Sequence, residues 1–283
     1  MVNVKILDIV TFLYLLSSTL YVTHSLFKKN RLGQLATYIT ITSLTGHTLA
    51  FVIRWIESYQ LGFGHFHIIN MYESLTFSVW AIVVIYMIIE FRIKTKIVGA
   101  FVLPLVSLIM IYASFSRSIN SQINPVPVLL QGNFYNYHII PCFLSYAAFT
   151  ISFGASVVLF LKSRKITNNP SGNDISHSLP PLEVLDDINY KAIAIGFILF
   201  TFQMIAGIFR TKIVLGSYWS WNLMQTWALI TWLIYAGILH GRFLRNWGED
   251  RTALLSITGF ITIIIGFLIA AGRIFSGTHY PIR

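Results

Sequence analysis

Eight long runs of apolar residues restrict what this chain can fold into. A helix needs about 20 mostly apolar residues to cross a hydrocarbon core about 30 Å thick. Runs of this kind cover approximately residues 6–27, 35–56, 71–91, 97–115, 138–161, 191–209, 224–241 and 253–272. Charged residues make up 11% of the chain, against about 25% in soluble proteins. We therefore predict an all-α integral membrane protein, a bundle of about eight transmembrane helices that forms a single polytopic membrane domain over residues 1–283.

The basic residues predict the orientation of this bundle, because cytoplasmic connections gather Lys and Arg. One set of alternate connections holds thirteen of the twenty: Lys28, Lys29, Arg31, Arg92, Lys94, Lys96, Lys162, Arg164, Lys165, Lys191, Arg242, Arg245 and Arg251. The other set, with both termini, holds Lys5, Arg54, Arg117, Arg210, Lys212, Arg273 and Arg283. We predict that both termini lie on the outer side of the cytoplasmic (inner) membrane. The net charge of +10 then reflects orientation in a lipid bilayer, and no nucleic-acid partner is expected.

Three further features describe the chain as a whole. The first apolar run is longer than the apolar core of a signal peptide, so we expect the N-terminus to be retained. Residues 162–190, rich in Asn, Ser and Pro, predict a polar cytoplasmic loop. Cys142 is the single cysteine and lies in an apolar run, so it forms no intrachain disulfide.

The stretch from Leu215 to His240 combines a tryptophan-rich segment with an apolar helix. Trp219, Trp221 and Trp227, with Tyr218 beside them, are predicted to lie at the outer membrane surface. Such side chains favour the boundary between water and lipid, and their flat rings can also stack on a flat ligand. The residues alone leave both interpretations open.

Two histidines are placed to reach that segment. His138 begins the fifth apolar run, and His279 follows the eighth on the same predicted side. Two neutral imidazoles can bind one haem iron from opposite faces, but interfacial histidines that bond to water or backbone fit the positions equally. His240 lies fifteen residues after Gln225, about 22 Å along a helix, so any haem at His240 would be a second one.

Other ionisable residues give weaker signals. His47, in the middle of the second run, is either an intramembrane functional residue or a histidine bonded between helices. His65 and His67 have metal-ligand chemistry but no companion acid or cysteine. Glu73 is predicted to pair with Arg54 or Arg273, or to serve as a helix-start carboxylate. No Ser-His-Asp set or Gly-rich phosphate loop appears, and we name no catalytic residue.

Several long segments resemble one protein family, in the same order. GHTLAFVIRWIESYQLGFGHFHIINMYESL is similar to its second helix, outer loop and third helix, and VGAFVLPLVSLIMIYAS to its fourth. NYHIIPCFLSYAAFTISFGAS is similar to the fifth helix, and GSYWSWNLMQTWALITWLIYAGILHGR to its WWD motif and the helix that follows. The family is that of the CcsA/ResC proteins of system II cytochrome c biogenesis, which handle haem.

The resemblance implies a haem-binding membrane subunit of a cytochrome c synthase, or haem lyase. Such a subunit delivers and orients haem b at the outer face for thioether attachment to apocytochrome c. The implied axial ligands at the outer face are His138 and His279, and the implied platform contains Trp219, Trp221 and Trp227. The resemblance also implies that His240 binds a second haem in the membrane, with the opposite ligand supplied by a ResB/CcsB-like partner.

Two departures from the family pattern leave an alternative open. Where the family has Asp-Pro-Lys-Glu after the second tryptophan, this chain has Asn-Leu-Met-Gln at residues 222–225, and it ends in GTHYPIR in place of GxHSY. A diverged, HemX-like paralogue would be a non-enzymatic haem carrier, a regulator, or a bis-histidine electron-transfer subunit. A structural protein and a transporter of another substrate also remain.

Overall fold

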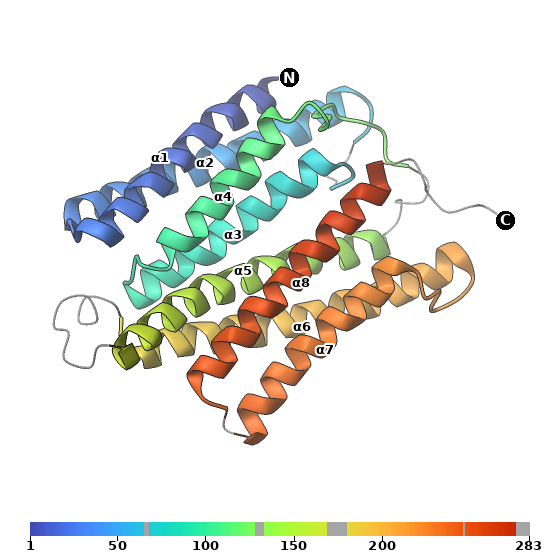
Figure 1. Ribbon diagram of the computed structural model, residues 1–283. Helices are drawn as coiled ribbons and strands as arrows, with labels where there is room; N and C mark the ends of the chain where they lie inside the picture. The colour runs from blue at the N-terminus through green and yellow to red at the C-terminus, as the bar shows by residue number, and fades with distance from the viewer. Residues whose placement is uncertain (65–67, 128–132, 169–179, 246, 276–283) are drawn as a thin grey trace. The chain divides into compact units, whose positions relative to one another are not determined.

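The computed structural model describes residues 1–64, 68–127, 133–168, 180–245 and 247–275 (Figure 1). Within these ranges all regular secondary structure is helical, and there is no strand. The helices are α1 (Val2–Phe27), α2 (Asn30–Gln60), α3 (Met71–Ile93), α4 (Gly99–Phe115), α5 (Asn133–Asn168), α6 (Leu182–Leu215), α7 (Leu223–Arg245) and α8 (Glu249–Phe275). Seven of them are long and apolar enough to span a membrane, and α4 is a shorter apolar helix. The predicted all-α, multi-pass class is confirmed.

Two helices extend beyond the apolar runs that predicted them. α5 has 36 residues and α6 has 34, more than the roughly 20 needed to cross a bilayer. Residues 162–168 and 182–190, predicted as parts of a polar loop, are therefore helical. The reason is that Lys, Arg and Glu end an apolar run without ending a helix, since they are good helix formers.

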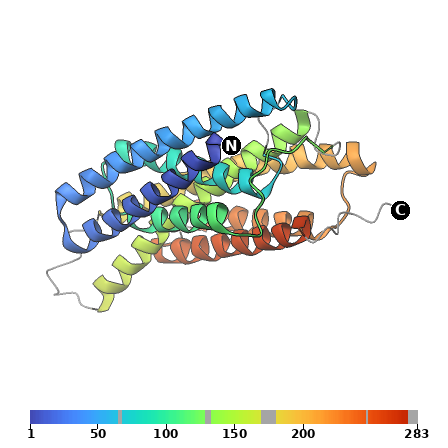
Figure 2. The ribbon, with the colours of Figure 1, turned by 90° about the horizontal axis from the view of Figure 1, so that it is seen from above.

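The chain divides into two compact units. Unit 1 comprises Met1–Gln131 with Arg164–Pro181, and unit 2 comprises Gly132–Ser163 with Leu182–Arg283. In unit 1, α1 packs against α2 and α4, and α3 packs against α4. Figure 2 shows α1 and α2 running side by side. Serine, threonine and alanine are frequent on their buried faces, which allows the helices to approach closely.

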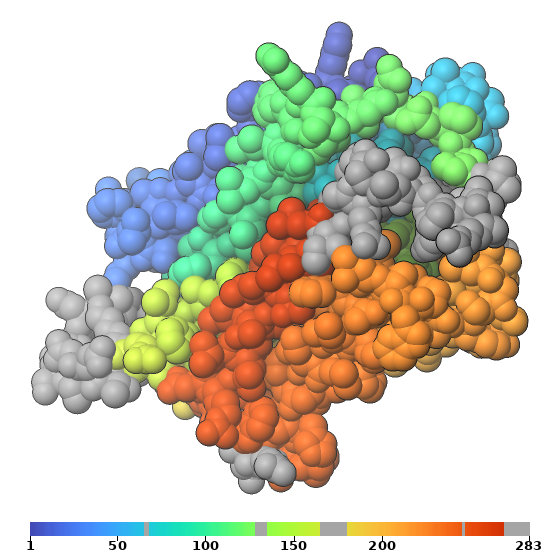
Figure 3. Space-filling model, turned by 45° about the vertical axis from the view of Figure 1, so that its right-hand side comes forward, coloured from blue at the N-terminus to red at the C-terminus, as the bar shows by residue number. Residues whose placement is uncertain are grey.

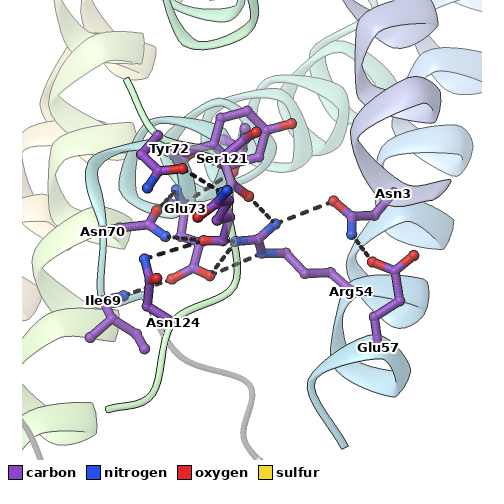
Figure 4. A network of polar contacts seen from close by, with 12 residues as sticks. Asn3, Arg54, Glu57, Ile69, Asn70, Tyr72, Glu73, Ser121 and Asn124 are labelled. Carbon is purple, nitrogen blue, oxygen red and sulfur yellow. Dashed lines mark hydrogen bonds and ion pairs between the residues drawn. The ribbon is translucent and has the colours of Figure 1, made fainter. Parts of the chain in front are cut away.

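An ion pair between α2 and α3 lies at one end of unit 1 (Figure 4). Arg54 donates from Nε and Nη2 to Oε1 of Glu73 at 2.9 and 2.7 Å, and from Nη1 to the Ser121 carbonyl at 3.0 Å. Glu73 also accepts from the backbone N–H of Ile69 at 2.9 Å, and Asn70 caps α3. Of the alternatives for Glu73, the structure selects Arg54, which is 6% exposed.

A second buried carboxylate lies at the other end of α3. Glu90 is 3% exposed and accepts hydrogen bonds from Tyr21, Tyr86 and Thr37 at 2.6, 2.5 and 2.5 Å. Lys96 donates to it at 2.6 Å and neutralises its charge. The two carboxylate networks hold α1, α2 and α3 together at both ends of unit 1.

Unit 2 is built around stacked aromatic rings. Phe149 of α5 lies 3.7 Å from Tyr235 of α7 between ring centroids, and Phe153 lies 4.5 Å from Phe260 of α8. Gly196 of α6 leaves room for the Phe149 ring. α7 and α8 pack against each other and are both visible on the face shown in Figure 3. These contacts hold together α5, which carries His138, and α7, which carries Trp227 and His240.

Candidate functional site

His138 lies in the second turn of α5, half-buried against α6. Its Nδ1 is 2.8 Å from the backbone carbonyl oxygen of Gln203. Because a carbonyl can only accept, Nδ1 carries the hydrogen, and the lone pair of the neutral ring is on Nε2. Histidines that bind metal ions have their second nitrogen held in this way. The role of His138 as an iron ligand stays a prediction.

A glycine makes this arrangement possible. A Cβ atom at Gly207 would lie 2.9 Å from Nδ1 and 3.0 Å from Cε1 of His138, closer than such atoms pack. Gln203 and Gly207 are four residues apart, so they lie on one face of α6. The first provides the hydrogen-bond acceptor and the second provides the space for the ring.

We expect Gly207→Ala to displace the His138 ring and, if His138 binds haem as predicted, to weaken that binding by about tenfold to a hundredfold, the usual cost of losing the hydrogen bond that orients a metal-binding histidine. Haem titration of the purified protein, followed by absorbance, measures this. Gly248→Ala is the control, because a Cβ there meets no atom within 4 Å. Equal affinity of the Gly207 variant and wild type would contradict the positioning role.

The tryptophan-rich segment forms the connection between α6 and α7. Trp219 and Trp221 meet edge to face, with ring centroids 5.6 Å apart. Trp221 is 72% exposed and has a φ of 51°, an uncommon conformation for a bulky residue that is often found at functional sites. Nε1 of Trp219 is buried and has no hydrogen-bond partner among the residues that the structure describes. This N–H can donate to a ligand.

The tetrapeptide that departs from the family pattern caps α7. The Asn222 side chain accepts from the backbone N–H of Gln225 at 2.9 Å. The Gln225 side chain accepts from the backbone N–H of Ser220 at 2.9 Å and donates to the Thr211 hydroxyl of α6 at 2.9 Å. Asn222 is thus the N-cap of α7, and Gln225 reaches back as in a capping box, but to the N–H of Ser220 and not to that of the N-cap residue. Asp and Glu in the same places accept the same backbone bonds, so the change from Asp-Pro-Lys-Glu alters charge more than hydrogen bonding.

We expect Asn222→Ala to cost about 1 kcal/mol of stability through loss of the cap. Asn222→Asp should be neutral or stabilising, because a carboxylate keeps the hydrogen bond and interacts favourably with the helix N-terminus. Thermal unfolding in detergent compares the two, with Met224→Ala, an exposed neighbour, as control. An aspartate variant as unstable as the alanine variant would show that Asn222 does not act as a cap.

The other two aromatic residues of the predicted platform have separate surroundings. Nε1 of Trp227 donates to the Thr262 carbonyl of α8 at 2.7 Å, and its ring packs against the backbone at Gly266. Tyr218 is 55% exposed, with the ammonium of Lys212 at 5.1 Å from its ring centroid. The structure brings Trp219 and Trp221 together, while Trp227 packs in the contact between α7 and α8. Their role as a haem platform stays a prediction.

His240 lies on an exposed face of α7, near the other end of that helix. Ile230, Leu233 and Gly237 share the exposed face, at helical spacing. Two residues further on, Arg242 forms an ion pair with Asp186 that fixes this end of α7 to α6.

The structure describes only some of the remaining histidines singled out by the sequence. His279, His65, His67 and His177 lie outside the residues that the structure describes. His47 is fully buried in unit 1, with Nδ1 at 3.4 Å from the Tyr14 hydroxyl, as a histidine bonded between helices would be. Within the described residues there is no group of three or more His, Cys, Asp or Glu residues placed to hold a metal ion.

Sequence reasoning missed Gln203, Gly207 and Thr211, which recur every four residues on α6. That spacing is a signal of a shared helix face. It does not reveal which face meets His138, because this depends on the register of α6 against α5.

Comparison with known proteins finds relatives of this chain among cytochrome c assembly proteins. Residues 68–272 match the family model described as cytochrome C assembly protein. The cytochrome c biogenesis protein CcsA of Prochlorococcus marinus subsp. pastoris is 33% identical over 289 residues, covering 94% of this chain and 88% of the relative. CcsA of Trieres chinensis is 33% identical over 261 residues, with 81% of each chain covered.

A solved structure has the same fold. It is that of the cytochrome c haem lyase CcmF, with a TM-score of 0.70 and 12% identity, covering 98% of this chain. The chain spans about half of that protein, 51% of its length.

Proposed function

This chain belongs to the cytochrome c assembly protein family and has a role in cytochrome c maturation, in which we propose that it binds haem b and orients it for thioether attachment to apocytochrome c. The proposed site is at the end of unit 2 formed by the start of α5, the end of α6 and the start of α7, which we call the tryptophan end. We propose that this end lies at the outer face of the cytoplasmic membrane, as the distribution of Lys and Arg predicts.

The observation that carries this proposal is the environment of His138. Its Nδ1–H is held by the Gln203 carbonyl at 2.8 Å, so Nε2 has the lone pair that haem iron requires. Gln225 fixes the tryptophan connection to the same helix, α6, through Thr211. Nε1 of the half-buried Trp219, which has no partner among the described residues, is a donor suited to a polar group of a ligand. These features fit a haem, with His279 proposed as the second axial ligand.

The residues of this site supply position, and bound haem supplies the vinyl groups to which cysteine thiols add. His138 would hold the iron, and ring faces and edges that exclude water would come from Trp219, Trp221, Trp227 and Tyr218. No residue of the site is assigned as an acid or a base. Orientation of two reactants alone is a large contribution to rate.

We propose a second haem at His240, ligated also by a ResB/CcsB-like membrane partner. An imidazole on an exposed face among Ile230 and Leu233 is costly in a bilayer unless it has a partner. Gly237, one turn away, has no atom within 4 Å of its Cβ position. A small residue there allows a partner helix to approach closely.

A non-enzymatic haem carrier, a HemX-like regulator or a bis-histidine electron-transfer subunit is the second candidate. The observation in its favour is the neutral Asn222 and Gln225, where the family has acids. Coexpression with the partner and a CxxCH reporter, in a host without its own maturation system, separates the two. Covalent haem on the reporter supports the synthase. A folded, haem-loaded protein that yields no covalent haem would leave the carrier as the better account.

A further inference from the structure

The tryptophan end of unit 2 combines basic residues with an absence of acids in the sequence around them. Residues 133–173 and 188–248 contain no Asp or Glu. Arg210 and Lys212 lie at the end of α6, immediately before the tryptophan connection. The electrostatic field at this end is therefore positive, which favours an anionic ligand.

Arg210 lies on the same side of α6 as the residues that position His138. It is three residues beyond Gly207, or about 4.5 Å further along the helix. Its Cζ lies 5.2 Å from the ring centroid of Tyr135, which is 6% exposed and precedes His138 by three residues on α5. The half-buried guanidinium is thus held about one turn of α6 beyond Gly207, which lies against the ring of the proposed iron ligand.

Lys212 has a different environment, although it carries the same charge two residues away. Its Nζ donates to the Gly216 carbonyl at 2.7 Å and contacts the ring of exposed Tyr218. These contacts stabilise the end of α6, and the residue itself is exposed. An ion pair with Lys212 would be screened by water and contribute little.

We propose that Arg210 binds a propionate carboxylate of haem, so that the site selects porphyrins that carry free carboxylates. This rests on the proposed haem site at His138. Arginine forms paired hydrogen bonds with carboxylates, and its contact with an aromatic face orders it beforehand. The Tyr135 contact is made with the face of the guanidinium, whereas the N–H donors that bind a carboxylate lie in its plane. Because Gly207, which lies against the His138 ring, and Arg210 are on successive turns of α6, the porphyrin would be oriented with its propionate edge toward the end of α6.

The test compares haem with haem dimethyl ester, which has the same macrocycle and iron but no carboxylates. Both are titrated into the purified full-length protein and followed by absorbance. We expect wild type to bind haem more tightly than the ester by about tenfold or more, the value of one charged hydrogen bond. Arg210→Gln should weaken haem binding by a similar factor and leave ester binding unchanged.

Lys212→Gln is the matched control, since it removes the same charge and should change haem affinity by less than about threefold. Arg210→Lys keeps the charge without the paired geometry, and intermediate affinity is expected. It also provides a folded variant for comparison if the glutamine variant is unstable. The reduction potential of bound haem should fall in Arg210→Gln and change less in Lys212→Gln, because the first cation is nearer the iron.

The outcomes separate the two proposals. Equal binding of haem and ester by wild type, or equal losses in the two glutamine variants, would overturn the role of Arg210 while leaving the haem site intact. If wild type binds neither compound with a histidine-ligated spectrum, the haem site itself is wrong and the Arg210 assignment fails with it.

Discussion

Replacing His138 with glycine is expected to remove haem from the tryptophan end of unit 2. The variant loses the nitrogen ligand but leaves a space beside Gln203 and Gly207 in which free imidazole can bind. Added imidazole should therefore restore the six-coordinate absorbance spectrum of the reduced protein. Haem content per protein and the reduced spectrum, with and without imidazole, measure the effect.

Two controls show whether a loss of haem is specific to the site at His138. His24→Gly removes a histidine whose Nδ1 contacts the Lys29 carbonyl in unit 1 and should leave haem content unchanged. A His240→Ala background removes the proposed second haem, so that only the site at His138 is counted. Unchanged spectra and stoichiometry in His138→Gly on that background would exclude His138 as the ligand. Rescue by imidazole would separate lost ligation from misfolding.

Glu73→Ala is expected to destabilise the protein by about 3–5 kcal/mol, because it leaves the buried Arg54 charge without its counter-ion. The side chains of this pair are 8% and 9% exposed. Glu73 also holds the Ile69 N–H at the start of α3, so the connection before α3 loses a bond as well. Unfolding in mixed detergent micelles, followed by circular dichroism, measures the loss.

The double variant Arg54→Met/Glu73→Leu should be more stable than Glu73→Ala, since it removes both charges and keeps the volume filled. Asp187→Ala is the matched control, because its ion pair with Lys191 is exposed, at 48% and 67%. We expect that control to cost about 0–1 kcal/mol. If Glu73→Ala cost no more than Asp187→Ala, the buried pair would not be a stabilising element of unit 1.

The two buried glutamates of α3, Glu73 and Glu90, show how far ion-pair partners can be predicted from the sequence. Glu73 was placed at a helix start with Arg54 as one of two partners, and the structure confirms that pair. Arg92 is the base nearest to Glu90 in the sequence, but the partner of Glu90 is Lys96, with Tyr21 and Tyr86 donating from α1 and from its own helix. Local sequence offered the acids and the nearest bases, and helix packing decided which base reaches each acid.

The residues at 222–225 show the same division. From the sequence, their difference from Asp-Pro-Lys-Glu leaves a diverged, HemX-like paralogue open. The structure adds that Asn222 and Gln225 cap α7 and tie the tryptophan connection to Thr211. An N-cap residue is visible in sequence once the start of the helix is known, but the bond to Thr211 is not, because it joins residues fourteen apart on different helices.

The sequence by itself determined the membrane class, the approximate spans and the candidate ligand His138, because apolar length and residue chemistry are local properties. The ends of α5 and α6 were less certain, since charged residues can continue a helix beyond the bilayer. Only the tertiary structure decided that Gln203 and Gly207 face His138 and that Arg210 lies one turn further along. The physical reason is register: a shift of α6 by one residue would rotate each of these groups by about 100° around the helix, and nothing in the local sequence fixes that shift.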